Sequence, residues 1–288
     1  MVRYARPETV DEALSLLGED AWRILAGGTD FYPALGAKPL RGNVLDINRL
    51  DELRGISETG EQIVIGARTT WTDIVNATLA PAFTALKQAA REVGSVQIQN
   101  RATVAGNLCN ASPAADGVPA LLVLDAEVEL RSHGGTRYLP LGEFILGNRK
   151  TARQPGELLT AIRIPKESTA GASTFLKLGA RRYLVISIAM VAVRLDIDAA
   201  ENVCDAAAAI GACSAVAQRL PELENTLMGA RAGETLAALA RPEHLSALSP
   251  IDDVRGSADY RRGAALEIVR RAIASSIAAR VELEGLAA

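Results

Sequence analysis

The sequence has few of the residues from which proteins build metal centres. Its 288 residues include three cysteines, Cys109, Cys204 and Cys213, and two histidines, His133 and His244. These cysteines are too few and too scattered for a disulfide framework or a four-cysteine cluster. With so few histidines beside them, we expect no zinc or iron site built by this chain. Its chemistry should therefore depend on an organic cofactor or on none.

The sequence also lacks a strong charge imbalance and long apolar runs. A net charge of −3 and an isoelectric point near 5.6 provide no basic surface, so nucleic acid is not an expected partner. No apolar run approaches the ~20 residues of a membrane span, and the first residues lack the apolar core of a signal peptide. We expect a cytoplasmic protein of two domains or one large domain.

The most informative stretch is residues 94–116, GSVQIQNRATVAGNLCNASPAAD. It shows neither helical nor strand periodicity and is dense in Gly, Ala, Ser, Thr and Asn. Small residues let a ligand approach the backbone, and consecutive N–H groups bind anions. We therefore predict a long functional loop here. A coiled connection whose polar side chains satisfy its own turns remains the alternative.

A second glycine-containing segment lies near the N-terminus. The apolar residues 23–26 read as a strand, residues 27–30 are Gly-Gly-Thr-Asp, and residues 31–38 favour a helix. A strand, a double glycine and a helix together point free backbone N–H groups at a phosphate. A Gly-Gly pair alone is more typical of a tight turn.

The remaining patterns predict an α+β protein. We expect hairpins within residues 55–67 and 127–140, with His133 solvated in the second turn. The polar residues 166–173 are the best candidate for a linker. Beyond them, strands precede helices, which is typical of an α+β domain. The expected strands are 174–180, 186–197 and 202–213, and the expected helices lie near 222–229, 234–240 and 258–284.

Three segments together closely resemble the flavoprotein (medium) subunits of the molybdenum hydroxylases. This group includes xanthine dehydrogenase, carbon monoxide dehydrogenase and the aldehyde or N-heterocycle dehydrogenases. The segments are AGGTD at 26–30, IGARTTWTDI at 65–74 and the whole of 94–116. Residues 156–165 and 175–187 resemble later parts of the same pattern, whereas the C-terminal third is similar only in outline.

The resemblance implies a fold and a division into domains. Residues 1–170 would form an FAD-binding domain of the vanillyl-alcohol-oxidase (PCMH) type, in two α/β lobes of about 1–56 and 57–170. Residues 171–288 would form an α+β domain of the CO dehydrogenase flavoprotein C-terminal type. The flavin would lie between the two domains.

The resemblance also implies which residues bind FAD. Residues 25–31 would hold the pyrophosphate, and Lys177 would favour the anionic reduced flavin. Cys109 is expected to be a small wall residue rather than a redox thiol, and no residue is expected to act as a catalytic acid or base. The implied cofactor-binding residues are Leu25, Ala26, Gly27, Gly28, Thr29, Asp30, Phe31, Thr103, Gly106, Asn107, Cys109, Asn110, Asp116, Leu159 and Lys177, of which the last two would approach the isoalloxazine from its far side.

Two positions depart from the family pattern. Ala105 stands where relatives carry the first glycine of a second Gly-Gly pair, and a positive φ at this alanine would strain the loop. The segment 183–185, Tyr-Leu-Val, is bulkier than in many relatives, so the residue that covers the flavin is not assigned.

The function implied by the resemblance is that of an electron-transfer subunit. Electrons from a molybdopterin large subunit would pass through 2Fe–2S clusters on a small subunit to FAD, and then to NAD+, oxygen or a quinone. We expect a dimer of such heterotrimers. Two alternatives stay open: a stand-alone FAD oxidoreductase of the same fold superfamily, and a scaffold subunit that has lost FAD. The sequence does not indicate the substrate.

Overall fold

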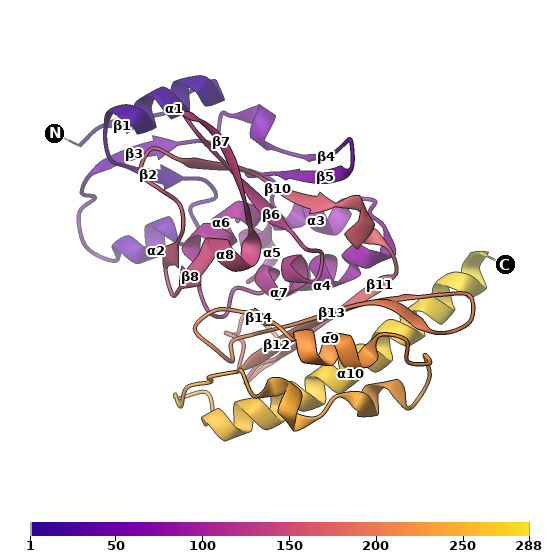
Figure 1. Ribbon diagram of the computed structural model, residues 1–288. Coiled ribbons are helices and arrows are strands. Elements are labelled where there is room, and N and C mark those ends of the chain that lie inside the picture. Colours follow the sequence, from indigo (N-terminus) through magenta and orange to yellow (C-terminus); the bar gives the residue numbers. More distant parts are fainter. Residues whose placement is uncertain (1, 288) are drawn as a thin grey trace.

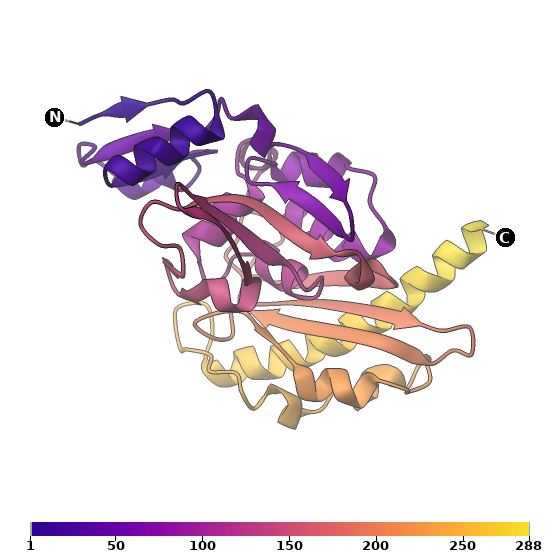
Figure 2. The same cartoon turned by 45° about the horizontal axis from the view of Figure 1, so that its top comes forward.

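The computed structural model describes residues 2–287, and the chain forms three main sheets that follow one another in sequence (Figure 1). A small parallel sheet comes first, a five-stranded antiparallel sheet second and a four-stranded antiparallel sheet last. In both ribbon views the last sheet and its helices lie beneath the middle unit, and the N-terminal sheet lies on the far side of that unit (Figure 2).

The N-terminal lobe packs its first helix against a small sheet, with Leu45 and Leu50 fully buried in the core. Its strands pair in the order β1-β3-β2, all parallel. Thr9 begins the first helix, because its side chain accepts a hydrogen bond from the backbone N–H of Glu12. The elements are β1 (Tyr4–Ala5), α1 (Val10–Glu19), β2 (Trp22–Leu25), α2 (Phe31–Leu35), β3 (Asn43–Asp46) and the 3₁₀ turn η1 (Asp51–Leu53).

The middle unit places an antiparallel sheet of order β4-β5-β10-β6-β7 against a layer of helices. Both predicted hairpins are confirmed, and His133 is exposed in the turn between β6 and β7. The strands are β4 (Ile56–Thr59), β5 (Gln62–Gly66), β6 (Glu127–Ser132), β7 (Gly135–Pro140), β8 (Ile145–Gly147), β9 (Lys150–Thr151) and β10 (Leu158–Pro165). The helices are α3 (Trp71–Asn76), η2 (Pro81–Phe83), α4 (Thr84–Glu92), α5 (Val96–Gln99), α6 (Val104–Asn110), α7 (Gly117–Leu122), α8 (Leu141–Phe144) and η3 (Lys166–Thr169).

The last sheet is buried on both faces. Met190 and Ala192 of β12 pack toward α4 and α7 of the middle unit, whereas Val191 and Val193 pack toward α10. The predicted order of strands followed by helices is confirmed. The elements are β11 (Ala172–Leu178), β12 (Ala189–Ile197), β13 (Val203–Gly211), β14 (Gln218–Arg219), α9 (Pro221–Leu227), η4 (Leu236–Leu239), η5 (Pro242–Leu245) and α10 (Ala258–Ala287).

The expectation of a long irregular loop at residues 94–116 is wrong for much of its length. The structure folds this stretch into α5 and α6. The Ser95 and Thr103 hydroxyls begin these helices by accepting hydrogen bonds from the N–H groups of Ile98 and Gly106. Helices of four and seven residues are too short to show an apolar stripe in the sequence, and tertiary packing stabilises them instead.

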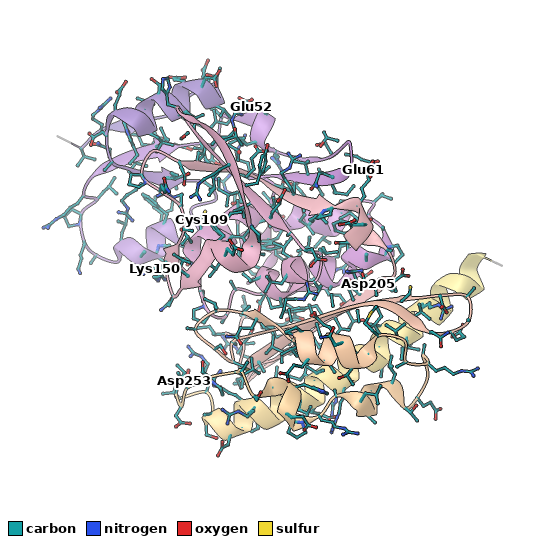
Figure 3. The ribbon with its side chains drawn as sticks, viewed as in Figure 1. Glu52, Glu61, Cys109, Lys150, Asp205 and Asp253 are labelled. Carbon is teal, nitrogen blue, oxygen red and sulfur yellow. The ribbon has the colours of Figure 1, made fainter. Side chains whose placement is uncertain are left out.

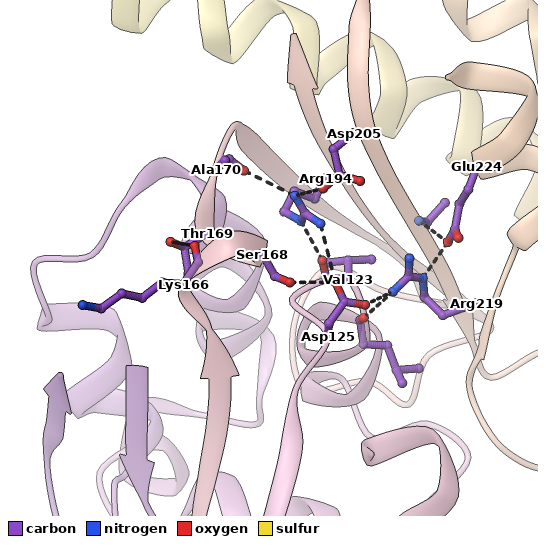
Figure 4. A network of polar contacts seen from close by, with 12 residues as sticks. Val123, Asp125, Lys166, Ser168, Thr169, Ala170, Arg194, Asp205, Arg219 and Glu224 are labelled. Carbon is purple, nitrogen blue, oxygen red and sulfur yellow. Dashed lines mark hydrogen bonds and ion pairs between the residues drawn. The ribbon is translucent and has the colours of Figure 1, made fainter. Parts of the chain in front are cut away.

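The polar segment 166–173, predicted as a linker, joins the middle sheet to the last one and is held in place. Ser168 is buried, and its hydroxyl donates a 2.8 Å hydrogen bond to the Asp125 carboxylate at the end of α7. Figure 4 shows this contact within a polar network that also includes Arg194 of β12 and Arg219 of β14. Within residues 2–287, no helix is long and apolar enough to cross a membrane.

Candidate cofactor site

A cavity of about 530 Å³ lies between the N-terminal lobe and the middle unit. Its walls come from the loop after β2, from the N-terminal part of α2, from α6, from the β8–β9 hairpin and from the start of β10. A volume of this size falls within the range of small-molecule and cofactor sites. The two glycine-containing segments singled out in the sequence therefore face one another across one space.

The loop after β2 presents backbone donors to this cavity. Gly27 lies directly against the backbone of Arg101, and a Cβ at this position would overlap the Arg101 carbonyl oxygen. Gly28 has φ +80°, a conformation that favours glycine. In the described part of the chain, the N–H groups of Gly27, Gly28 and Thr29 meet no protein acceptor. Three adjacent free donors at a cavity wall form a cradle for an anion.

The opposite wall is α6. Ala105 is buried within this helix and has no positive φ, so the strain considered at this position does not arise. Asn107 lines the cavity, and its Oδ1 atom is buried without a protein partner. Cys109 is open to the cavity, while desolvation by the surrounding walls raises the pKa of its thiol to about 11. The Cys109 side chain is therefore a neutral wall group at pH 7.

A third wall carries two arginines. Arg149 lies in the turn of the β8–β9 hairpin and donates a 3.0 Å hydrogen bond to Asn110 Oδ1. Arg153 follows β9 and donates to the backbone oxygen of Glu157 at 2.8 Å. Glu157 is itself held by Arg137 in a two-point ion pair. In the side-chain view, Cys109 and Lys150, which neighbour this wall, are labelled on the same side of the molecule (Figure 3).

Asp116 and Lys177 form a buried ion pair. The Lys177 ammonium lies 2.6 Å from Asp116 Oδ2, and the Ser187 hydroxyl donates to Oδ1 at 2.7 Å. Both charged side chains are less than one-tenth exposed. Burial raises the pKa of Asp116, and the hydrogen bonds and charge of these two partners oppose that rise. Lys177 is therefore buried and paired with a carboxylate.

Most of the residues expected to bind the cofactor line this cavity. Those that do are Ala26, Gly27, Gly28, Thr29, Asp30, Phe31, Thr103, Gly106, Asn107, Cys109, Asn110 and Leu159. Leu25 is buried at the end of β2, and Asp116 and Lys177 lie outside the lining. Gly117, the neighbour of Asp116, approaches Asn107, so the ion pair sits one layer behind the α6 wall.

The charged part of the lining is not among the residues predicted from the sequence. Arg23, Arg149 and Arg153 all line the cavity, beside the single acidic residue Asp30. The Gly147-Asn148 pair next to Arg149 is a turn signal that could have indicated the hairpin of the third wall. No local signal places Arg23, because a strand residue reaches the cavity only through the packing of β2 against its neighbours.

The lining suits a cofactor that carries a diphosphate and an extended ring. Free N–H donors bind phosphate oxygens, arginine side chains attract anionic groups in general, and the apolar side chains of Ile47, Val93 and Leu159 offer surface to flat rings. Among residues 2–287, no group of His, Cys, Asp and Glu side chains is arranged to hold a metal ion.

Comparison with protein families agrees with this arrangement. The family described as "FAD binding domain in molybdopterin dehydrogenase" matches residues 1–167. The family described as "CO dehydrogenase flavoprotein C-terminal domain" matches residues 174–276.

Individual relatives match over nearly the whole chain. The glyceraldehyde dehydrogenase medium chain of Sulfolobus acidocaldarius is 33% identical over 262 residues, 90% of this chain and 92% of its own length. The carbon monoxide dehydrogenase medium chain of Afipia carboxidovorans is 32% identical over 286 residues, 94% of each chain. The crystal structure of quinoline 2-oxidoreductase from Pseudomonas putida 86 superposes with a TM-score of 0.88 at 26% identity, covering 97% of this chain and 98% of the other.

Proposed function

This chain belongs to the family of FAD-binding medium subunits of the molybdenum hydroxylases, and we propose how its cavity holds the cofactor. Gly27, Gly28 and Thr29 bind the diphosphate through their backbone N–H groups. Asn107, Cys109 and Leu159 line the space for the rest of FAD. The observation that supports this most strongly is the row of N–H groups without protein acceptors at the cavity wall.

The protein contributes binding, orientation and electrostatics. Bound FAD supplies the electron-transfer chemistry. The glycine cradle fixes the diphosphate, the α6 wall positions the rest of the cofactor, and the buried Asp116–Lys177 pair supports that wall from behind. We keep Leu25, Asp116 and Lys177 as predicted cofactor neighbours, with the isoalloxazine placed at the Leu159 end of the cavity.

We further propose the division into domains and the assembly. Residues 1–170 form the FAD domain, with lobes of about 1–56 and 57–170, and residues 171–288 form the C-terminal domain. The two family matches lie on either side of this boundary. An iron–sulfur small subunit and a molybdopterin large subunit complete the complex, as a dimer of heterotrimers. NAD+, oxygen or a quinone as acceptor and a cytoplasmic location remain predictions.

The cradle is tested by Gly28→Ala, with Gly60→Ala as the matched control. Both glycines have positive φ, but Gly60 lies in the β4–β5 turn, away from the cavity. Each alanine is strained by its positive φ, but only the methyl group at position 28 also meets a neighbour, the Tyr32 ring, so the loop that carries the three N–H groups must shift. We expect Gly28→Ala to weaken FAD binding at least tenfold, about 1.4 kcal/mol, measured by flavin fluorescence with apoprotein. Equal affinities in both variants would refute the assignment.

Co-purification tests the assembly. The native chain should carry FAD that acid precipitation releases into the supernatant, because no histidine lines the cavity and the Cys109 thiol is neutral. It should also purify with one partner rich in cluster cysteines and one that holds molybdopterin. A chain that purifies alone with its own substrate turnover would favour a stand-alone oxidoreductase.

A further inference from the structure

We propose that Arg149 tunes the bound cofactor: its guanidinium faces the ring of FAD and stabilises the negative charge that the ring gains on reduction. The inference rests on the proposed function, which places the ring at the Leu159 end of the cavity. Arg149 lines this cavity. Within the described chain its only side-chain partner is Asn110, a neutral amide. It is thus a cation without a carboxylate, facing the space for an anionic ligand.

The backbone around Arg149 is held in an unusual conformation. Arg149 has φ +56° and Ala111 has φ +48°, both in the left-handed region that non-glycine residues rarely adopt. The two residues are joined, because the Arg149 N–H donates a 3.0 Å hydrogen bond to the Ala111 carbonyl. Together with the side-chain bond to Asn110, this contact fixes the hairpin turn to the end of α6. Strain of this kind is typical of functional positions.

Arg149 lies beside the C-terminal end of α6, away from the diphosphate cradle. Gly27 lies against Arg101, just before the helix begins, whereas Arg149 contacts Asn110 and Ala111 at its end. A helix of seven residues spans ~10 Å. The guanidinium therefore lies beyond the cradle, at the end of α6 that continues toward the last sheet, where Ala212 donates to the Pro113 carbonyl.

The other cation expected at this end is already neutralised. The ammonium of Lys177 is bound to Asp116 in a buried pair and lies outside the cavity lining. A change in ring charge acts more strongly on an unpaired cation nearby than on a paired one, since the carboxylate cancels most of the field of the ammonium. The role that the family resemblance suggested for Lys177 therefore belongs to Arg149.

The test compares two cavity arginines in the FAD-loaded chain. Arg149→Asn removes the charge, and asparagine tolerates a left-handed backbone better than most residues. Arg23→Gln removes a charge from the same cavity on the N-terminal lobe, where Arg23 stacks on Phe31. The measurements are the midpoint potential of the bound flavin and the dissociation constants of oxidised FAD and of ADP. Circular dichroism checks that each variant is folded.

We expect Arg149→Asn to favour oxidised over reduced FAD about tenfold relative to the parent chain, a fall of ~30 mV in the two-electron potential. Its affinity for ADP should stay within threefold, and Arg149→Lys should recover most of the potential. Arg23→Gln should leave the potential unchanged. An unchanged potential in Arg149→Asn, or a tenfold loss of ADP affinity there, would overturn the proposal. Failure of the parent chain to bind FAD would instead refute the proposed function.

Discussion

At the scale of single residues, the site combines backbone donors with a few placed side chains. The cradle depends on Gly27 and Gly28, for which any side chain would collide or strain the loop. The opposite wall depends on small residues, among which Cys109 offers a chemical probe. Its thiol opens to the cavity, whereas Cys204 is exposed at the surface and Cys213 is fully buried.

FAD should protect Cys109 from alkylation. At pH 8 we expect N-ethylmaleimide to modify Cys109 and Cys204 in the apoprotein, with Cys109 the slower because burial holds its pKa near 11. Saturating FAD should slow labelling of Cys109 at least tenfold and leave Cys204 unaffected, as read by peptide mass spectrometry. Equal labelling of Cys109 with and without FAD would place the cofactor elsewhere.

Glu157, which contacts Arg137 and Arg153 at the third wall of the cavity, makes the stability of the fold depend on pH. Burial by itself would raise the pKa of Glu157, but hydrogen bonds from Arg137 and the Gln154 N–H, together with the charge of Arg153, lower it below its ordinary value. A carboxylate with a depressed pKa stabilises the fold above its unfolded pKa of about 4.3 and loses this contribution as pH falls through the folded value.

The Glu157→Gln variant tests this linkage. We expect the parent chain to lose more unfolding free energy than the variant between pH 6 and pH 3, measured by urea denaturation with tryptophan fluorescence. Glu143→Gln is the control, because Glu143 is exposed and makes no ion pair within residues 2–287. A parallel loss in parent and Glu157→Gln would show that this carboxylate does not couple folding to protons.

At the scale of elements, a polar network around Arg194 connects the last sheet to the middle unit. This side chain is 1% exposed and pairs with Asp205 at 2.7 Å and with Asp125 at 3.7 Å. It also donates to the Val123 carbonyl at the end of α7 (Figure 4). One buried cation therefore ties β12, β13 and α7 together at the same point as the 166–173 connection.

Arg194→Met should destabilise the chain by about 2–3 kcal/mol. Removing a buried ion-pair partner typically costs 3–5 kcal/mol, but both aspartates are nearly half exposed and can be rehydrated. Arg271→Met removes an exposed pair with Glu267 on α10 and should cost less than 1 kcal/mol. Chemical denaturation of both variants measures the difference. A loss in Arg194→Met as small as in the control would show that the network adds little to the docking.

At the scale of the whole molecule, one apolar core extends from the middle unit into the last sheet. Phe175, Met190 and Ala209 of the last sheet belong to the same buried cluster as Trp71 and Leu121 of the middle unit. An apolar core shared in this way couples the units, because neither can unfold without exposing the other's buried surface.

We therefore expect one unfolding transition for the chain. Both tryptophans, Trp22 and Trp71, report on the first 170 residues, whereas α10 contributes strongly to far-UV circular dichroism. The two signals should coincide in urea, and FAD at a hundred times its dissociation constant should add about 2.7 kcal/mol. A helical signal that survives the tryptophan transition would show that the last sheet and α10 fold independently.

The sequence by itself determined the class of the protein and much of its site. The residue patterns predicted the α+β architecture and both hairpins, and the family resemblance predicted FAD. Of the fifteen residues expected to bind it, twelve line the cavity. Such features are local. A few adjacent residues are enough to specify a glycine turn, an alternating strand or a hairpin.

Only the tertiary structure decided the charges around the cavity. Nothing in the sequence pairs Lys177 with Asp116, 61 positions away, or leaves Arg149 without a carboxylate in the cavity wall. The short helices α5 and α6 likewise depend on packing and caps rather than on a periodic pattern. The physical reason is the same in each case, since the net effect of a charge or a short helix depends on neighbours that only folding brings together.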